Sequence, residues 1–180
     1  YRNKAKLNDD IYVTGNLGDS YLGLKVLSNK TKFKKKDKLF FVDKYYKPDL
    51  PLNLTKYLLK FANSSIDISD GLIDDLSKMI NRQNLSFNLF EKKIPVSKYL
   101  GNLIKNQRLN KINLISNGDD YQVLFTANAN KERIIKNISR NMGVKITKIG
   151  KIISGKNRSV IINAKGKQIK ANKKGYIHHF

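Results

Sequence analysis

Apolar residues recur along the chain with two different periods, which divide it into short strands and amphipathic helices. Segments whose apolar residues run together or alternate are expected as strands, namely 11–15, 64–69, 85–90, 121–126, 144–153 and 159–171, the last as a hairpin. Segments that repeat apolar residues every three or four positions are expected as helices, namely 20–29, 52–63, 72–82, 97–109 and 131–142. Residues 39–46 fit either a helix or an extended segment, and residues 30–38 form a charged connection.

These strands and helices intermix without a regular strand–helix–strand rhythm. We therefore expect an α+β domain with a mixed β-sheet. No internal repeat and no hinge-like linker interrupts residues 1–180, so a single domain is the simplest organisation. Where the first helix begins, Asp19 or Ser20 is expected to cap it.

The composition is that of a globular protein, and it excludes several kinds of site. Hydrophobic residues make up 40% of the 180 residues and charged residues 28%, so a folded core is expected rather than disorder. Cysteine is absent, which excludes a disulfide scaffold, a thiolate metal site and a cysteine nucleophile. The two histidines, His178 and His179, are adjacent, which argues against a histidine-rich zinc site. The first ten residues lack the apolar core of a secretory signal, and no apolar run reaches membrane-spanning length.

The net charge of +22 would suit a polyanion, because 36 Lys and Arg residues face only 14 Asp and Glu. However, only 6 of these bases are Arg, the residue favoured for recognising phosphates and base edges. The chain is also rich in Asn and Ile, as an A+T-rich coding sequence would produce. We therefore favour a compositional origin of the charge over a dedicated nucleic-acid surface.

Two windows of the chain contain no basic residue, one between Lys60 and Lys78 and the other between Lys111 and Lys131. Hard divalent cations such as Mg²⁺ are bound by carboxylate oxygens and substrate phosphates, and a neighbouring ammonium group competes for those oxygens. Six of the 14 acidic residues lie in these windows: Asp67, Asp70, Asp74, Asp75, Asp119 and Asp120.

The first window contains the segment Ile66–Leu72. Asp67 lies late in the predicted strand, on the face opposite Ile66 and Ile68, and Asp70 lies at the turn into the next helix. The two carboxylates could bind a divalent cation, and the free N–H groups at the start of the helix could hold a phosphate. The alternative is that Ser69 or Asp70 caps the helix and that Asp74 and Asp75 complement its dipole.

The second window contains the segment 116–121 (SNGDDY), whose adjacent carboxylates repel each other unless a positive group lies beside them. A metal, a cationic substrate or a lysine could supply that charge, and a simple polar turn is the alternative. The aromatic tail 175–180 could stack on a flat ligand or pack on the core. The chain lacks a P-loop, a G-x-G-x-x-G turn, a G-x-S-x-G elbow and the aromatic pattern of an RNA-recognition motif.

Taken in order, several segments resemble the C-terminal part of the thiamine-monophosphate kinase family. This family belongs to the aminoimidazole-ribonucleotide synthetase and selenophosphate synthetase superfamily. The resemblance spans essentially the whole chain and is most specific in SSIDISDGL, GDDYQVLF and the closing GY. The segments that carry it are 9–27, 45–48, 62–80, 115–126, 146–152 and 175–180.

The resemblance implies a layered α/β/α domain and an ATP-dependent transfer of a phosphoryl group onto thiamine monophosphate. It implies that Asp67 and Asp70 bind Mg²⁺, that Ser69 contacts ATP, that Asp119 contacts the thiamine substrate and that Tyr176 packs on it. Asp74, Asp75 and Asp120 are then expected to be structural. The full-length protein is expected to be a cytoplasmic homodimer whose N-terminal domain is missing from this chain.

The chain departs from the family pattern in three places. The N-terminal G-D-D segment, which binds most of the metals in the family, is absent, so this chain would supply only part of the site. The family tends to have an Arg near its proline-rich turn, where this chain reads YYKPDLPLN, and Asp119 stands where Glu is also common. The rival hypotheses are another ATP-using enzyme of the superfamily with a different acceptor, and a basic nucleic-acid-binding module without catalytic activity.

Overall fold

The computed structural model describes residues 2–30, 33–107 and 109–170, and its elements follow the apolar pattern closely. The strands are β1 (Asp10–Thr14), β2 (Ser64–Asp67), β3 (Leu85–Phe90), β4 (Val123–Ala127), β5 (Ile146–Ser154), β6 (Val160–Ile162) and β7 (Gln168–Lys170). The α-helices are α1 (Asp19–Leu27), α2 (Lys35–Tyr46), α3 (Thr55–Leu58), α4 (Leu72–Met79), α5 (Lys98–Gln107), α6 (Lys111–Ile115) and α7 (Glu132–Met142). Short 3-10 turns are η1 (Leu52–Leu54), η2 (Glu91–Lys93) and η3 (Ala129–Lys131).

The strands form one mixed sheet in the order β2-β4-β1-β5-β3-β6-β7. The β3–β6 pair is parallel and the other pairs are antiparallel, which confirms the mixed sheet expected from the sequence. All five residues of β1 are buried, because this strand lies inside the sheet with helices over both of its faces.

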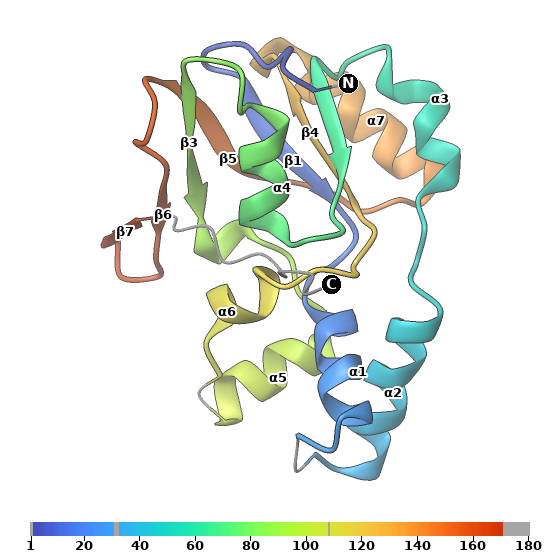
Figure 1. Ribbon diagram of the computed structural model, residues 1–180. Helices are drawn as coiled ribbons and strands as arrows, with labels where there is room; N and C mark the ends of the chain where they lie inside the picture. Colours follow the sequence, from blue (N-terminus) through green and yellow to red (C-terminus); the bar gives the residue numbers. More distant parts are fainter. Residues whose placement is uncertain (1, 31–32, 108, 171–180) are drawn as a thin grey trace.

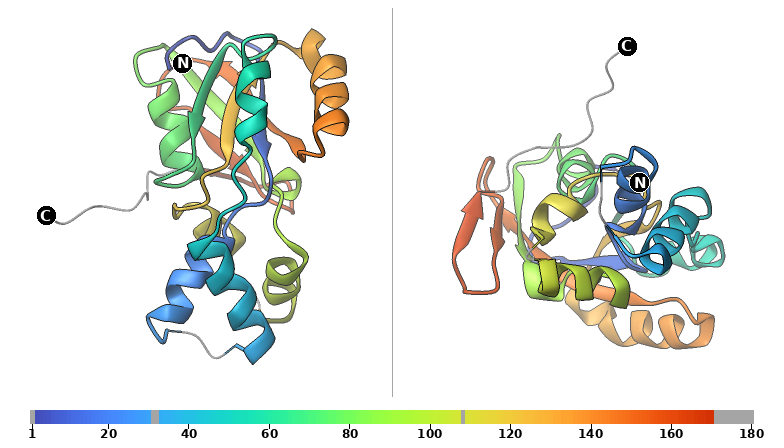
Figure 2. Two further views of the ribbon diagram at one scale, coloured as in Figure 1. Left: turned by 90° about the vertical axis from the view of Figure 1, so that its right-hand side faces the viewer. Right: turned by 90° about the horizontal axis from the view of Figure 1, so that it is seen from below.

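Helices cover the two faces of the sheet in an α/β/α arrangement (Figure 2). On one face, α4 packs against the sheet through Leu72, Leu76 and Met79, all fully buried. On the other face, Ile135 and Ile138 of α7 are buried in a second apolar cluster, to which η1 and α3 also contribute. The layered α+β fold expected from the resemblance is therefore confirmed.

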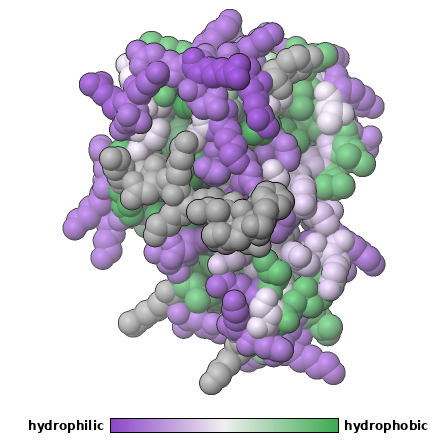
Figure 3. Space-filling view, in the orientation of Figure 1, coloured by the Kyte–Doolittle hydropathy of each residue, from purple (hydrophilic) through white to green (hydrophobic). Residues whose placement is uncertain are grey.

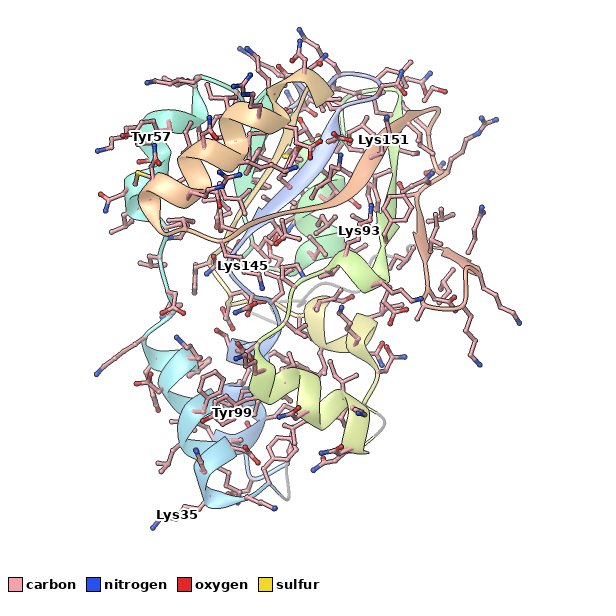
Figure 4. The ribbon with its side chains drawn as sticks, turned by 180° about the vertical axis from the view of Figure 1, so that it is seen from behind. Lys35, Tyr57, Lys93, Tyr99, Lys145 and Lys151 are labelled. Carbon is pink, nitrogen blue, oxygen red and sulfur yellow. The ribbon has the colours of Figure 1, made fainter. Side chains whose placement is uncertain are left out.

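Helices α1, α2, α5 and α6 form a separate helical lobe beyond one end of the strands (Figure 1). Its small core contains Leu22, Phe41, Leu100 and Leu114, which come from all four helices. The ring of Tyr99, labelled in Figure 4, stacks on the ring of Phe40 at 4.2 Å and so joins α5 to α2. The sequence did not predict α6, and it left residues 39–46 undecided between a helix and an extended segment.

The elements predicted at 52–63 and 121–126 have different bounds in the structure. The helix expected over 52–63 consists only of η1 and α3, because the chain enters the sheet at Asn63, whose N–H donates to Thr126 O at 2.8 Å. The strand expected from residue 121 begins at Val123, because Tyr121 has a left-handed backbone with φ of +50°.

Hydrophilic residues cover most of the upper part of the face in Figure 3, whereas apolar residues gather over the helical lobe. Among the helices in the described part of the chain, none is long and apolar enough to cross a membrane.

The packing of α1 on α2 can be tested at Gly23. A Cβ atom added to this glycine would overlap Phe41 O, whereas one added to Gly101 of α5 would meet its nearest neighbour at 3.9 Å. We expect Gly23→Ala to lower the free energy of unfolding by roughly 1–3 kcal/mol, as overpacking does. Gly101→Ala is the matched control, and we expect it to stabilise the protein by up to about 1 kcal/mol because Ala favours a helix. Urea denaturation measures both changes, and equal effects would contradict the helix packing described above.

Candidate functional site

The two acidic segments found in the sequence lie side by side at the end of the β2–β4 pair. The antiparallel ladder ends with Asp67 opposite Val123. Backbone hydrogen bonds extend it into the loops, from Ile68 N to Gln122 O at 2.8 Å, from Tyr121 N to Ile68 O at 2.9 Å and from Asp119 N to Ser69 O at 3.0 Å. We call residues 67–71 and 116–122, joined in this way, the acidic seam. It places Asp67, Ser69, Asp70 and Asp119 on neighbouring stretches of backbone.

Gly118 allows the two halves of the acidic seam to approach each other this closely. A Cβ atom at this position would overlap Ser69 O, so a side chain would force the two loops apart. The Asn-Gly-Asp-Asp sequence is therefore more than a polar turn, because its glycine is required by the contact with the other acidic loop.

Asp75 holds the loop at residues 69–71 in place. Its Oδ2 accepts hydrogen bonds from the backbone N–H groups of Ser69, Asp70 and Gly71 at 3.0, 2.9 and 3.1 Å. Neither Ser69 nor Asp70 caps α4, whose N-cap residue is Gly71 without a side-chain hydrogen bond, so the capping alternative is wrong. These three N–H groups are also not free to hold a phosphate as the structure stands. The expectation that Asp75 is structural agrees with these contacts.

The two candidate metal ligands differ in their surroundings. Asp67 is exposed at the end of β2, whereas Asp70 forms an ion pair with Lys78, which also lies 3.1 Å from Asp74 Oδ2. Burial lowers the pKa of Lys78, but hydrogen bonds to Asp70 and Asp74 outweigh it, so the pKa is raised and the ammonium is retained. A cation at Asp70 would have to share that carboxylate with Lys78.

Within residues 2–30, 33–107 and 109–170, no group of three or more His, Cys, Asp or Glu residues could hold a metal ion. Mg²⁺ is commonly held by only one or two carboxylates together with substrate phosphates and water. Asp67 and Asp70 fit that kind of site, in which most of the ligands come from the substrate, and not a site made entirely of protein side chains.

The adjacent carboxylates of Asp119 and Asp120 lie in different environments. Asp120 is buried, and its Oδ2 accepts a hydrogen bond from Gly18 N at 2.8 Å, at the start of α1. Burial raises the pKa of Asp120 well above its usual range, the Gly18 N–H opposes the shift, and the charges of Asp19 and Asp119 add to it. Asp119 is only partly buried. The sequence analysis expected a positive group beside this pair of acids. For Asp120, the partially positive N-terminal end of α1 supplies it.

Tyr121 is a site residue that the sequence analysis did not identify. This residue is 42% exposed, and its hydroxyl lies 3.4 Å from Asp119 Oδ1. Burial raises the pKa of the Tyr121 phenol, and the charges of Asp119, Tyr45 and Asp67 raise it further. The available signal in the sequence was an aromatic residue directly after a pair of acids.

A cavity of about 280 Å³ lies where the helical lobe meets the strand ends, and Asp120 and Gln122 of the acidic seam line it together with Asp19, Lys44 and Tyr99. Asp19 does not cap α1 as expected, and neither does Ser20, because Gly18 is the N-cap residue. The side chain that binds the start of this helix is that of Asp120, from the acidic seam. The buried Asp19 carboxylate instead accepts a hydrogen bond from the Ser97 hydroxyl at 2.7 Å.

Tyr176, the other residue assigned to the substrate, lies outside the described residues, as does the whole segment 175–180. The basic residues labelled in Figure 4 are spread over the rear of the molecule rather than gathered in one place. Lys35 lies on α2 in the lobe, Lys93 on η2, Lys145 before β5 and Lys151 on β5.

The buried Asp19 predicts a pH-dependent stability. Burial raises its pKa from 3.8 to about 6, so the folded protein holds this proton more tightly than the unfolded chain. Stability is therefore lost as the pH rises through this range. In Asp19→Asn this loss is absent, so we expect the variant to gain up to about 3 kcal/mol relative to the parent between pH 4 and pH 7.

Denaturant unfolding at several pH values measures this gain. Asp43→Asn, at an exposed position on α2, controls for the loss of one negative charge. If the difference in the free energy of unfolding between Asp19→Asn and the parent did not change with pH, the prediction would be contradicted.

No family model matches the chain. Among curated proteins, the thiamine-monophosphate kinase of Aquifex aeolicus is 31% identical over 178 residues, which is 98% of this chain and 54% of that protein. The enzyme of the same name from Buchnera aphidicola subsp. Schizaphis graminum is 35% identical, and that of Escherichia coli K12 is 30% identical, each over 98% of this chain and 54% of the relative.

Solved structures of thiamine-monophosphate kinases also resemble this chain. The structure described as AaThiL complexed with AMPPCP and TMP matches 99% of this chain and 53% of its own, with a TM-score of 0.77 and 30% identity. The thiamine-monophosphate kinase of Stenotrophomonas maltophilia matches with a TM-score of 0.76 and 26% identity, over 93% of this chain and 53% of that one. Escherichia coli HypE, at 14% identity and a TM-score of 0.71, shares the fold over 96% of this chain and 52% of its own.

The chain spans about half the length of the curated relatives that it matches. Its likeness to them extends over 98% of its own residues and includes both halves of the acidic seam. In sequence and in fold, this chain is a relative of the thiamine-monophosphate kinases.

Proposed function

We propose that the full-length protein transfers a phosphoryl group from ATP to the phosphate of thiamine monophosphate, giving thiamine diphosphate. The present chain would be its C-terminal domain and would supply part of the ATP, metal and substrate sites. The observation that carries this proposal is the acidic seam, which brings Asp67, Ser69 and Asp70 beside Asp119 although the two loops are far apart in the sequence. A kinase of this kind has to hold its phosphate donor and its acceptor next to each other.

The carboxylates of Asp67 and Asp70 would hold Mg²⁺ at the end of β2. The bound ion would supply positive charge to the phosphates of the substrates. Ser69 lies between these two residues in the sequence and would offer its hydroxyl to ATP. Asp75 keeps Ser69 and Asp70 in place, because its carboxylate accepts hydrogen bonds from their N–H groups.

Asp119 would bind the cationic thiazolium ring of the substrate. Its carboxylate is partly exposed, and it lies across the acidic seam from the proposed metal ligands. Opposite charges attract strongly at a partly desolvated site, so an anionic side chain suits this ring. Tyr176 would pack on the same substrate.

The named relatives support this function. Curated proteins of 30–35% identity are named thiamine-monophosphate kinase, and the structure described as AaThiL holds AMPPCP and TMP. Because this chain spans about half of those relatives, we propose that a further N-terminal domain completes the nucleotide and metal site and forms a homodimer. Another acceptor within the same superfamily is the alternative, and the assay below separates the two.

Two substitutions in the full-length protein test the site. We expect Asp67→Asn to lower kcat by about 100-fold or more, a loss typical of removing a group that stabilises charge in the transition state. We expect Asp119→Asn to raise the KM for thiamine monophosphate by roughly 10- to 100-fold, because one charged contact to the ring is lost. Thiamine diphosphate formation at varied Mg²⁺ and substrate concentrations measures both. Asp43→Asn is the control and should match the parent.

The same assay decides between the alternatives. Turnover of another phosphate acceptor, with none of thiamine monophosphate, would favour a different enzyme of the superfamily. RNA or DNA binding that weakens steeply with salt and is unaffected by Asp67→Asn would favour the nucleic-acid module.

The proposed division of the site also predicts the behaviour of the isolated chain. We expect the 180 residues alone to fold but to show little kinase turnover, because upstream residues would complete the site. Circular dichroism checks the fold, and the assay above checks the activity. Turnover comparable to that of the full-length protein would contradict the two-domain proposal.

A further inference from the structure

The backbone of Tyr121 has a conformation that is unfavourable for a residue with a bulky side chain. Its φ of +50° is in the left-handed region, which is strained for a bulky aromatic residue. The residue is nevertheless 42% exposed, so no burial in the core compensates for the strain. Strain of this kind persists only where the surrounding structure enforces it, and it is common at binding sites.

The neighbours of Tyr121 in the sequence enforce this conformation. The Tyr121 N–H donates to Ile68 O at 2.9 Å, and Asp120 is fixed to Gly18 N at 2.8 Å. On the other side, the Gln122 side chain accepts from the Thr14 hydroxyl at 2.7 Å and donates to Asp49 O at 2.7 Å. Residues 120 and 122 are therefore anchored to β1, α1 and the loop after α2, and Tyr121 between them is held outward.

The ring of Tyr121 lies among acidic and phenolic groups. Its hydroxyl is 3.4 Å from Asp119 Oδ1, and Asp67 and Tyr45 are near enough to act electrostatically on the same hydroxyl. These groups come from β2, the end of α2 and the loop before β4, so the cluster exists only in the folded protein. None of them carries a positive charge.

An exposed aromatic face beside carboxylates suits one class of ligand. A flat organic cation gains from the ring face, from stacking and from the negative charge together. A phosphate group would be repelled by Asp119 and Asp67 unless a metal ion intervened. Tyr121 therefore matches the ring end of a substrate whose phosphate end lies at the proposed metal ligands.

We propose that Tyr121 contacts the flat cationic ring of the substrate and helps to determine specificity for it, and that Asp120 is the positioning residue that holds Tyr121 there. This proposal rests on the proposed function, because it assigns the ring end of the same substrate. It adds Tyr121 as a second ring contact beside Asp119.

Steady-state kinetics of the full-length protein test the proposal. Tyr121→Leu removes the aromatic face, and we expect the KM for thiamine monophosphate to rise about 10-fold while the KM for ATP changes less than about twofold. Tyr121→Phe keeps the face and should stay within about threefold of the parent. Tyr57→Leu is the matched control, because Tyr57 lies on α3, away from the acidic seam, and carries a similar ring (Figure 4).

Inhibition separates the ring contact from the phosphate contact. Free thiamine carries the cationic ring without phosphate, and pyrophosphate carries phosphate without the ring. We expect Tyr121→Leu to weaken inhibition by thiamine about 10-fold and to leave inhibition by pyrophosphate unchanged. Asp120→Ala should also raise the KM for thiamine monophosphate. Asp120→Asn keeps an acceptor for the Gly18 N–H, so its KM should stay near that of the parent. Thermal melting checks that each variant is folded.

The outcomes distinguish this proposal from the proposed function. An active parent with an unchanged KM in folded Tyr121→Leu, or an equal rise in the KM for ATP, would overturn the role of Tyr121 alone. A parent without kinase turnover that binds thiamine in calorimetry, with binding lost in Tyr121→Leu, would overturn the function and support the ring contact. A parent that neither turns over nor binds thiamine would overturn both.

Discussion

The hydrogen-bonded seam between residues 67–71 and 116–122 is the constraint on which the rest of the site depends. It continues the β2–β4 ladder beyond the last paired residues. Backbone hydrogen bonds hold the two acidic loops directly beside each other. Gly118 is required there, because any side chain would overlap Ser69 O. The acidic residues of the site are then held by backbone contacts and not by attraction between their side chains, which repel one another.

The same region joins the two parts of the molecule. Asp120 binds the first N–H groups of α1 and so connects the end of the sheet to the helical lobe. Asp19 and Gln122 line the cavity between these parts and contact Ser97 and the loop after α2. Several buried polar groups are thereby satisfied by partners from distant elements, which gives the junction one preferred geometry. Burial disfavours the charged forms of Asp19 and Asp120 and so raises the pKa of both carboxyl groups.

The distribution of charge separates the site from the rest of the surface. The chain carries a net charge of +22, but the acidic seam contains several carboxylates and the exposed aromatic residue Tyr121. Lys78 of α4 pairs with Asp70 of this seam and with Asp74 of the same helix. This contrast suits a ligand with a cationic ring and with phosphates held through a metal, and it does not require the basic surface to take part.

The sequence by itself determined most of the secondary structure, the mixed sheet and the identity of the acidic loops, because these depend on local periodicity and composition. The segment 52–63 was predicted too long, and α6 was missed, because contacts with the sheet and the lobe decide where those elements begin and end.

Only the tertiary structure decided what each acid does. Asp75 and Asp120 bind backbone N–H groups, Asp70 pairs with Lys78, and Asp67 and Asp119 stay accessible at the acidic seam. Tyr121 became a site residue only when its strained backbone and its acidic neighbours were known. Their burial and partners come from elements far apart in the sequence, so local pattern could not assign these roles.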